Sequence, residues 1–170
     1  MNRATERPVF RQRGSIRTDL HAIAMASETP KGGKSAVVKL RVPFHDLDPL
    51  HVVWHGNYLK YFDIARFALF EEAGIDLYRY TLDRQIIFPI TRFSMKNIVA
   101  LRHNDLFTCR AVATEARYKI AMDFDIRRDS DGAVCARAKS EQLAVKLPDM
   151  EMQFEIPADI CSALGFGHGA

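Results

Sequence analysis

The sequence predicts an α+β domain in which a curved, five-stranded antiparallel sheet wraps around one long helix. Three segments support this prediction. Residues 36–44 alternate between apolar and polar side chains, residues 58–73 carry apolar side chains at helical spacing, and residues 86–147 contain strand-like runs separated by turns. With 170 residues, the chain is long enough for one such domain and too short for two.

The first strand is expected over residues 36–44. Its apolar face consists of every second residue, namely Ala36, Val38, Leu40, Val42 and Phe44. Lys39 and Arg41 fall on the opposite face, so the strand should be buried on one side only. The polar cluster from His45 to Pro49 follows it and favours a turn.

A long helix is expected to begin after Asn57, a favourable N-cap residue, and to end before Gly74, which suits the position after a helix. Apolar residues recur along it at intervals of three and four: Tyr58, Tyr61, Phe62, Ala65, Leu69 and Ala73. Four further apolar residues widen this stripe: Ile64, Phe67, Ala68 and Phe70. We therefore expect a helix that is buried over most of its circumference.

The rest of the domain should be made of strands. Four are expected: residues 86–100 with an interruption at a proline, 107–115, 118–128 and 133–147. The Asp131-Gly132 pair predicts a hairpin turn before the last of them. One helix cannot cover both faces of such a sheet, so we expect the outer face and the edges to be buried by oligomerisation.

The composition divides the chain into three parts. Residues 1–34 carry seven Lys or Arg against three acidic residues, and we expect them to be a disordered or processed basic leader. Residues 35–150 should form the folded domain. Residues 151–170 are expected to be a C-terminal tail with a short helix over residues 157–166.

Charge and composition exclude several functional classes. Outside the leader, 17 basic side chains face 18 acidic ones, which argues against a nucleic-acid-binding surface. No stretch approaches the roughly 18 consecutive apolar residues of a membrane-spanning helix. The three cysteines are too few and too widely spaced for a disulfide framework or a Cys-based zinc site, which indicates a reducing, cytoplasmic location.

Polar side chains are concentrated directly before the predicted helix: His45, Asp46, Asp48, His51, His55 and Asn57. The start of a helix offers free backbone N–H groups and a positive dipole end, which suit a developing oxyanion. A carboxylate beside it can act as general base or nucleophile. The segment could therefore hydrolyse an ester or thioester without a serine, or its residues could simply form turns and caps. We expect neither a metal site nor a dinucleotide-binding motif here.

Residues 46–66 have the sequence DLDPLHVVWHGNYLKYFDIAR. This segment resembles the 4-hydroxybenzoyl-CoA thioesterase family of hotdog-fold acyl-CoA hydrolases, in which D-x-D, V-V-[YW]-H, N-Y and A-R occur in this order. The resemblance implies the hotdog fold and hydrolysis of an acyl-CoA or acyl-carrier-protein thioester. No metal or cofactor is implied, and CoA takes part only as a portion of the substrate. A homodimer with sheets joined edge to edge, often doubled to a homotetramer, is also implied, with active sites at the dimer interface.

The resemblance also implies roles for individual residues. Asp48 matches the catalytic carboxylate and would be the general base or the nucleophile. His55 would give its backbone N–H to the thioester oxygen and its ring to water or the leaving group. The oxyanion site at the helix entrance would consist of His55, Gly56, Asn57 and Tyr58. Asp46 matches the first Asp of the pattern and would be a turn or orienting residue. Apart from the resemblance, His51 and Trp54 are further supporting candidates, since Trp54 could shield the carboxylate from water.

One departure from the family leaves alternatives open. Leu50 and His51 stand where many members have small residues, often glycine. Asp46 and His51 also resemble the D-x-N-P-x-H motif of (R)-specific enoyl-CoA hydratases, another hotdog group, so water addition to a double bond is one alternative. A hotdog subunit that binds acyl chains without turnover is another. Candidate contacts for CoA phosphates are Lys96, Arg102, Arg117 and Lys119.

Overall fold

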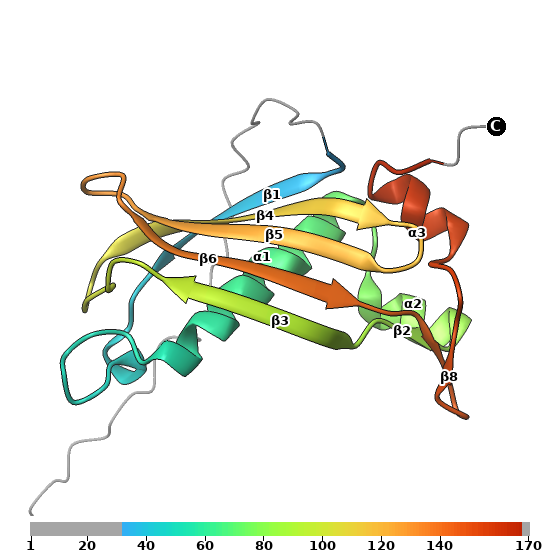
Figure 1. Ribbon diagram of the computed structural model, residues 1–170, viewed down its shortest axis with the longest axis horizontal. Helices are drawn as coiled ribbons and strands as arrows, with labels where there is room; N and C mark the ends of the chain where they lie inside the picture. The colour runs from blue at the N-terminus through green and yellow to red at the C-terminus, as the bar shows by residue number, and fades with distance from the viewer. Residues whose placement is uncertain (1–31, 168–170) are drawn as a thin grey trace, which may run out of the picture.

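The computed structural model describes residues 32–167, and within them a five-stranded antiparallel sheet carries the long helix α1 (Tyr58–Glu72) across one face (Figure 1). The strands lie in the order β1-β4-β5-β6-β3. Their bounds are β1 (Ser35–Arg41), β3 (Ile90–Asn97), β4 (Leu106–Ala116), β5 (Ile120–Arg128) and β6 (Val134–Gln142). The predicted α+β architecture is confirmed. The leader predicted for residues 1–34 lies almost entirely outside the described residues.

The register of the sheet places alternate side chains in the core. Val38 is paired with Cys109, and Cys109 in turn with Ile126, and all three are buried against α1. The intervening residues face outward and carry charges, as in the exposed ion pair between Lys139 and Asp123, whose charged atoms are 3.2 Å apart. The main sheet is thus apolar on the helix side and polar on the other, as strict alternation requires.

Helix α1 contributes the apolar stripe that its spacing predicts. Its buried hydrophobic residues are Tyr58, Tyr61, Phe62, Ala65, Leu69 and Phe70. Gly74 has a φ of +78° and ends the helix as predicted. The expectation of burial over most of the circumference is wrong within one chain, because Ile64 and Phe67 remain 37% and 45% exposed. These two residues form an apolar face with no covering element in the described part of the chain.

Two elements differ from the sequence prediction. The strand expected over residues 133–147 divides after Gln142, and β7 (Val145–Lys146) pairs instead with β2 (Ile86–Ile87) and β8 (Glu151–Met152) in a separate small sheet. Helix α2 (Leu77–Arg84) was not predicted. It is short, mostly polar and without a fully buried residue, and Asp76 caps it by accepting the N–H of Arg79 at 3.0 Å.

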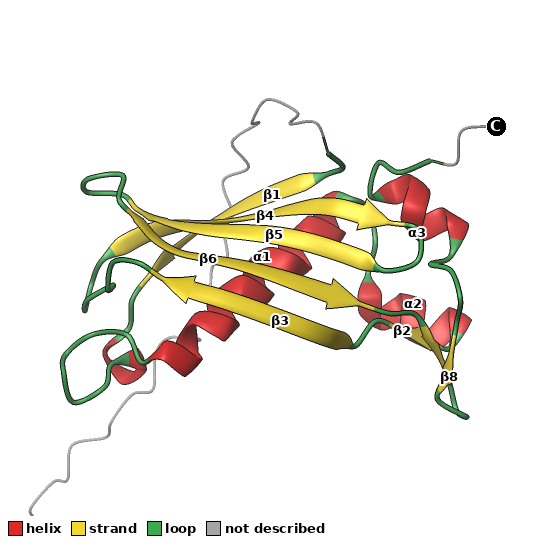
Figure 2. Cartoon of the chain, in the orientation of Figure 1, coloured by secondary structure: helices red, strands yellow, loops and turns green. Residues whose placement is uncertain are grey.

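The end of the chain packs into the domain. Helix α3 (Ala158–Ala163) lies within the segment where a short helix was expected. Ile160 and Leu164 are almost completely buried, and the N–H of Lys34 donates to the carbonyl of Leu164 at 2.8 Å. Figure 2 shows α2, α3 and the small sheet gathered at one end of the main sheet, opposite the loops that precede α1.

None of the helices in residues 32–167 has both the length and the apolar character needed to cross a bilayer.

We predict that Leu164→Ala destabilises the whole domain by about 2–5 kcal/mol, because it leaves a cavity in a site that is 0% exposed. The free energy of unfolding, measured in urea, should fall by this amount in a single transition. Met152→Ala, at a side chain that is 66% exposed, serves as the control and should change it by less than about 0.5 kcal/mol. An unchanged stability of Leu164→Ala would show that the C-terminal segment does not belong to the cooperative core.

Candidate active site

The polar residues predicted as a site lie in one loop between β1 and α1. A 3₁₀ turn, η1 (Phe44–Asp46), opens this loop, and a second one, η2 (His55–Asn57), runs directly into α1. Between them the chain folds back on itself, with a bridge between Leu47 and Val53. The loop therefore brings the D-x-D pair and the helix entrance to the same end of the molecule.

Asp48 lies at the base of the tight turn within this loop. Its carbonyl accepts the N–H of His51 at 3.0 Å, and its own N–H donates to Val52 at 2.9 Å. The side-chain Oδ1 accepts the N–H of Leu50 at 2.8 Å, which fixes the carboxylate on the turn. Asp48 is half-buried, and no cation lies within ion-pair distance of it among the residues described. Its second oxygen, Oδ2, is left for an external partner.

Asp46 has a different environment, since only 2% of it is exposed. The hydroxyl of Tyr61 donates to its Oδ2 at 2.6 Å, and the ammonium of Lys60 donates to its Oδ1. Burial alone would raise the pKa of Asp46, but the hydrogen bonds and the charge of Lys60 outweigh burial and hold it below the usual value. Asp46 is therefore a charged anchor between the loop and α1. Neither Lys60 nor Tyr61 was predicted for this role. The helical spacing of Tyr61 indicated only that its side chain would be buried in the core.

The backbone of Asp46 anchors the same loop a second time. Its carbonyl accepts the N–H of Trp54 and the side-chain N–H of Asn57, both at 2.9 Å. Asn57 occupies the N-cap position as predicted, but its side chain makes no capping bond. The prediction that Asn57 caps the helix through its side chain is thus wrong, because the Asp46 carbonyl takes the amide instead.

The helix entrance presents two free backbone donors. In the described chain, the N–H groups of His55 and Gly56 have no protein acceptor, since they open a 3₁₀ turn, whereas that of Asn57 donates to Trp54 at 2.8 Å. The positive end of the α1 dipole lies behind them. Trp54 lies over this turn, and a Cβ added to Gly56 would come within 2.2 Å of its ring. Glycine at position 56 is therefore required for this packing.

Tyr58, predicted at the helix entrance, points into the core and is 2% exposed. Its hydroxyl accepts the N–H of Leu101 at 3.2 Å, and burial raises its pKa. It thus ties a second loop, residues 98–105, to α1. A bridge between Val52 and Arg102 fastens the two loops together.

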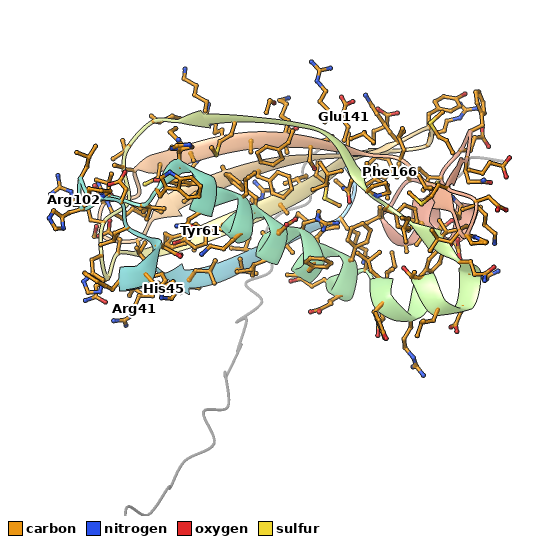
Figure 3. The ribbon with its side chains drawn as sticks, turned by 90° about the horizontal axis from the view of Figure 1, so that it is seen from below. Arg41, His45, Tyr61, Arg102, Glu141 and Phe166 are labelled. Carbon is orange, nitrogen blue, oxygen red and sulfur yellow. The ribbon has the colours of Figure 1, made fainter. Side chains whose placement is uncertain are left out.

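Two further histidines lie at this end of the molecule. The Nε2 of His45 is 3.6 Å from Asp46 Oδ1, and the ring of His103 meets the edge of Phe44 with centroids 5.6 Å apart. Figure 3 shows Arg41, His45 and Arg102 at the same end. His51, on the tight turn, is exposed and has a φ of +58°. No group of three or more potential metal ligands occurs within residues 32–167.

The A-R pair of the predicted family pattern holds α1 onto the sheet. Ala65 is completely buried, and Arg66 is 9% exposed. The guanidinium of Arg66 donates to the Gln142 side chain on β6 at 2.9 Å and to Asp63 at 2.9 Å. Such a buried charge needs these partners, so the pair fixes the rotation of α1 over the sheet.

Comparison with known proteins agrees with this geometry. The family model of the thioesterase-like superfamily matches residues 42–164, from the end of β1 to α3. The chain belongs to this superfamily. A curated relative, 4-hydroxybenzoyl-CoA thioesterase from Pseudomonas sp. (strain CBS-3), is 28% identical over 88 residues. That match covers 51% of this chain and 62% of the relative, so the chain spans less than two thirds of the relative's length.

Solved structures of thioesterases share the fold. A 1,4-dihydroxy-2-naphthoyl-CoA thioesterase from Synechocystis is 17% identical, with a TM-score of 0.71 over 76% of this chain and 95% of its own. The 4-hydroxybenzoyl-CoA thioesterase from Pseudomonas sp. is 23% identical, with a TM-score of 0.69 over 76% of this chain and 99% of its own. The predicted hotdog fold and the family resemblance are confirmed. The roles of individual residues stay predictions.

We predict that Asp46→Asn lowers the free energy of unfolding by about 2–3 kcal/mol, because it removes charge-assisted hydrogen bonds in a buried site. Asp123→Asn, in an exposed ion pair, is the control and should cost no more than about 1 kcal/mol. The free energies of unfolding of the wild type and both variants are measured by urea denaturation at neutral pH.

The difference in unfolding free energy between wild type and Asp46→Asn should also depend on pH. Because the pKa of Asp46 is lower in the folded than in the unfolded state, its stabilisation is complete above the unfolded value of 3.8. It disappears as the pH falls through the lower, folded value. The stability gap between wild type and Asp46→Asn should therefore close in acid. A gap that is equal at pH 7 and at acid pH would contradict an ionised Asp46.

Proposed function

We propose that this chain hydrolyses acyl thioesters of CoA, or of acyl carrier protein, to a free acid and a thiol. The observation that carries the proposal is that Asp48, a fixed and half-buried carboxylate, and the free N–H groups of His55 and Gly56 lie in the same loop. Membership of the thioesterase-like superfamily supports it. Three compared structures are described as thioesterases of 1,4-dihydroxy-2-naphthoyl-CoA, 4-hydroxybenzoyl-CoA and gentisyl-coenzyme A, all aromatic acyl groups.

In the proposed mechanism the thioester oxygen accepts hydrogen bonds from the amides of His55 and Gly56. These donors and the α1 dipole stabilise the negative charge that develops on the oxygen, an effect worth roughly 10²–10³ in rate for one donor. Asp48 Oδ2 takes a proton from the attacking water or attacks the carbonyl carbon itself, while Oδ1 stays bonded to the N–H of Leu50. Water and side chains suffice for this reaction, and CoA enters as part of the substrate.

The alternative of enoyl-CoA hydration finds little support in the loop geometry. It requires Asp46 to activate water together with His51. The Asp46 carboxylate is buried and already bonded to Lys60 and Tyr61, so it has no room for a water molecule or a substrate. A binding subunit without turnover would have no use for a fixed, accessible carboxylate such as Asp48.

We also propose a homodimer formed through the edge strand β3. Its outer edge has no neighbouring strand in the described chain, and an unpaired edge of eight residues invites a second copy. The exposed face of α1 at Ile64 and Phe67 would add apolar area to that contact. Association of two such dimers would give the homotetramer that the family resemblance suggests.

Two of the four candidate phosphate contacts are available for a ligand. Lys119 pairs with Glu141 at 3.0 Å, and Arg117 lies over the ring of Tyr118 and 3.9 Å from Glu155. Within the described chain, Lys96 and Arg102 have no carboxylate at ion-pair distance. Arg102 borders the loop of Asp48, so we propose it as the contact for a CoA phosphate.

A cytoplasmic location is also proposed. Cys109, Cys135 and Cys161 are free and buried, and burial raises the pKa of each thiol. Such thiols are inert and unpaired, which fits a reducing compartment.

We predict that the wild type releases thiol from at least one acyl-CoA in a panel of aromatic, short and long acyl groups, and that Asp48→Asn lowers kcat by at least about 10²-fold. Asp83→Asn, an exposed carboxylate on α2, is the control and should leave kcat unchanged. Thiol release is followed with a thiol-reactive dye. Equal turnover by wild type and Asp48→Asn would contradict the assignment.

For the assembly, we predict that light scattering gives the mass of a dimer or tetramer and that Phe67→Glu shifts it toward a monomer, since it places a charge in the apolar contact. Phe154→Glu, at a side chain that is 82% exposed and lies outside both α1 and β3, is the matched control and should keep the wild-type mass. A monomeric wild type at micromolar concentration would refute the dimer.

A further inference from the structure

His51 holds a backbone conformation that residues with a Cβ usually avoid. Its φ of +58° lies in the left-handed region, where the Cβ crowds the neighbouring carbonyl. The residue follows Asp48, Pro49 and Leu50 in the tight turn and precedes Val52, whose carbonyl closes the loop with the N–H of Asp48. Glycine is the usual residue at the left-handed position of a short hairpin loop. The chain carries an imidazole there instead.

The fold gives no packing reason for this imidazole. His51 is exposed, and in residues 32–167 its side chain makes no hydrogen bond, ion pair or ring contact. The other three described histidines all have neighbours. His45 faces Asp46, His55 lies against Trp54 with ring centroids 5.0 Å apart, and His103 meets Phe44. Of these four imidazoles, that of His51 is therefore the one without a contact inside the described part of the chain.

His51 is also within reach of the reacting atoms of the proposed function. Its N–H donates to the carbonyl of Asp48 at 3.0 Å, so the two residues are the ends of one β-turn. The Cα atoms at the ends of such a turn are less than about 7 Å apart. The side chains of Asp48 and His51 thus start from neighbouring backbone positions, close enough for both to contact one thioester.

The proposed reaction also needs a proton donor for the leaving thiolate. The family resemblance offers the ring of His55 for this step, but that ring lies against Trp54, with centroids 5.0 Å apart. Asp48 serves the water or the carbonyl carbon, and the amides of His55 and Gly56 serve the carbonyl oxygen. The sulfur of a CoA thioester leaves as an alkyl thiolate, which is basic and gains from a proton donor. A histidine side chain is the usual donor near neutral pH.

On the basis of the proposed function, we propose that His51 is a catalytic residue whose imidazole protonates the departing thiolate. The oxygen of water bonds to the carbonyl carbon while Asp48 takes its proton. The carbon–sulfur bond then breaks, the electron pair goes to sulfur, and the imidazolium of His51 gives its proton to sulfur. The proton on Asp48 passes to the imidazole and restores both groups, so one thioester and one water yield one acid and one thiol.

The test compares two leaving groups on the same acyl group. One is N-acetylcysteamine, an alkyl thiol, and the other is thiophenol, a more acidic thiol that leaves without a proton. His51→Gly should lower kcat for the alkyl thioester on the order of 10²-fold. Its effect on kcat for the aryl thioester should be much smaller. Its Tm should stay equal or rise, because glycine accepts the left-handed backbone. A merely structural role would lower both rates together.

Gln85→Gly is the matched control. Gln85 also has a positive φ, of +53°, but it ends α2 at the opposite end of the molecule. Its replacement should leave both rates unchanged. If His51→Gly lowers kcat equally for both thioesters, or does not lower it at all, the proposed role of His51 is wrong. Hydrolysis by the wild type would still support the proposed function in that case. A wild type that hydrolyses neither thioester and no acyl-CoA would overturn both.

Discussion

The arrangement of the loop before α1 depends on the buried Asp46. A carboxylate that is 2% exposed is unfavourable unless it is fully bonded. Lys60 and Tyr61 satisfy it from the first turn of α1, and its own carbonyl holds Trp54 and Asn57. One residue thereby ties the end of β1, the helix entrance and the helix itself into a single unit. Any movement of the loop would leave a buried charge without partners, so the geometry of the entrance is strongly determined.

The two carboxylates of the D-x-D pair therefore have separate tasks. Asp46 is the last residue of η1 and turns inward, whereas Asp48, two residues later, lies on the turn, where its Oδ1 accepts the N–H of Leu50. The same residue type thus serves once as a bonded anchor and once, in the proposed function, as the reactive group. The difference arises from burial and partners and not from chemical identity, as is general for carboxylates in active sites.

The rest of the molecule leaves surfaces that a single chain cannot cover. Helix α1 spans one face of the main sheet, but Ile64 and Phe67 remain 37% and 45% exposed, and the outer edge of β3 has no neighbouring strand in the described residues. The helix is rotated so that Arg66 reaches Gln142, and this rotation turns the extra apolar side chains outward. The apolar excess seen in the sequence of the helix is consistent with two buried contacts, one with its own sheet and one with a second copy.

By itself, the sequence determined the α+β class, the extent of α1 and most of the main strands, because each of these follows from a local period of side chains. It also placed the candidate site, since the D-x-D, H-G-N-Y and A-R residues lie close together along the chain. Only the tertiary structure decided which carboxylate is buried, where the amide of Asn57 points, and that His51 has a left-handed backbone. It likewise decided α2 and the division between β6 and β7. These features depend on contacts between distant segments, such as Asp46 with Tyr61 and β7 with β2, and a local pattern does not record such contacts.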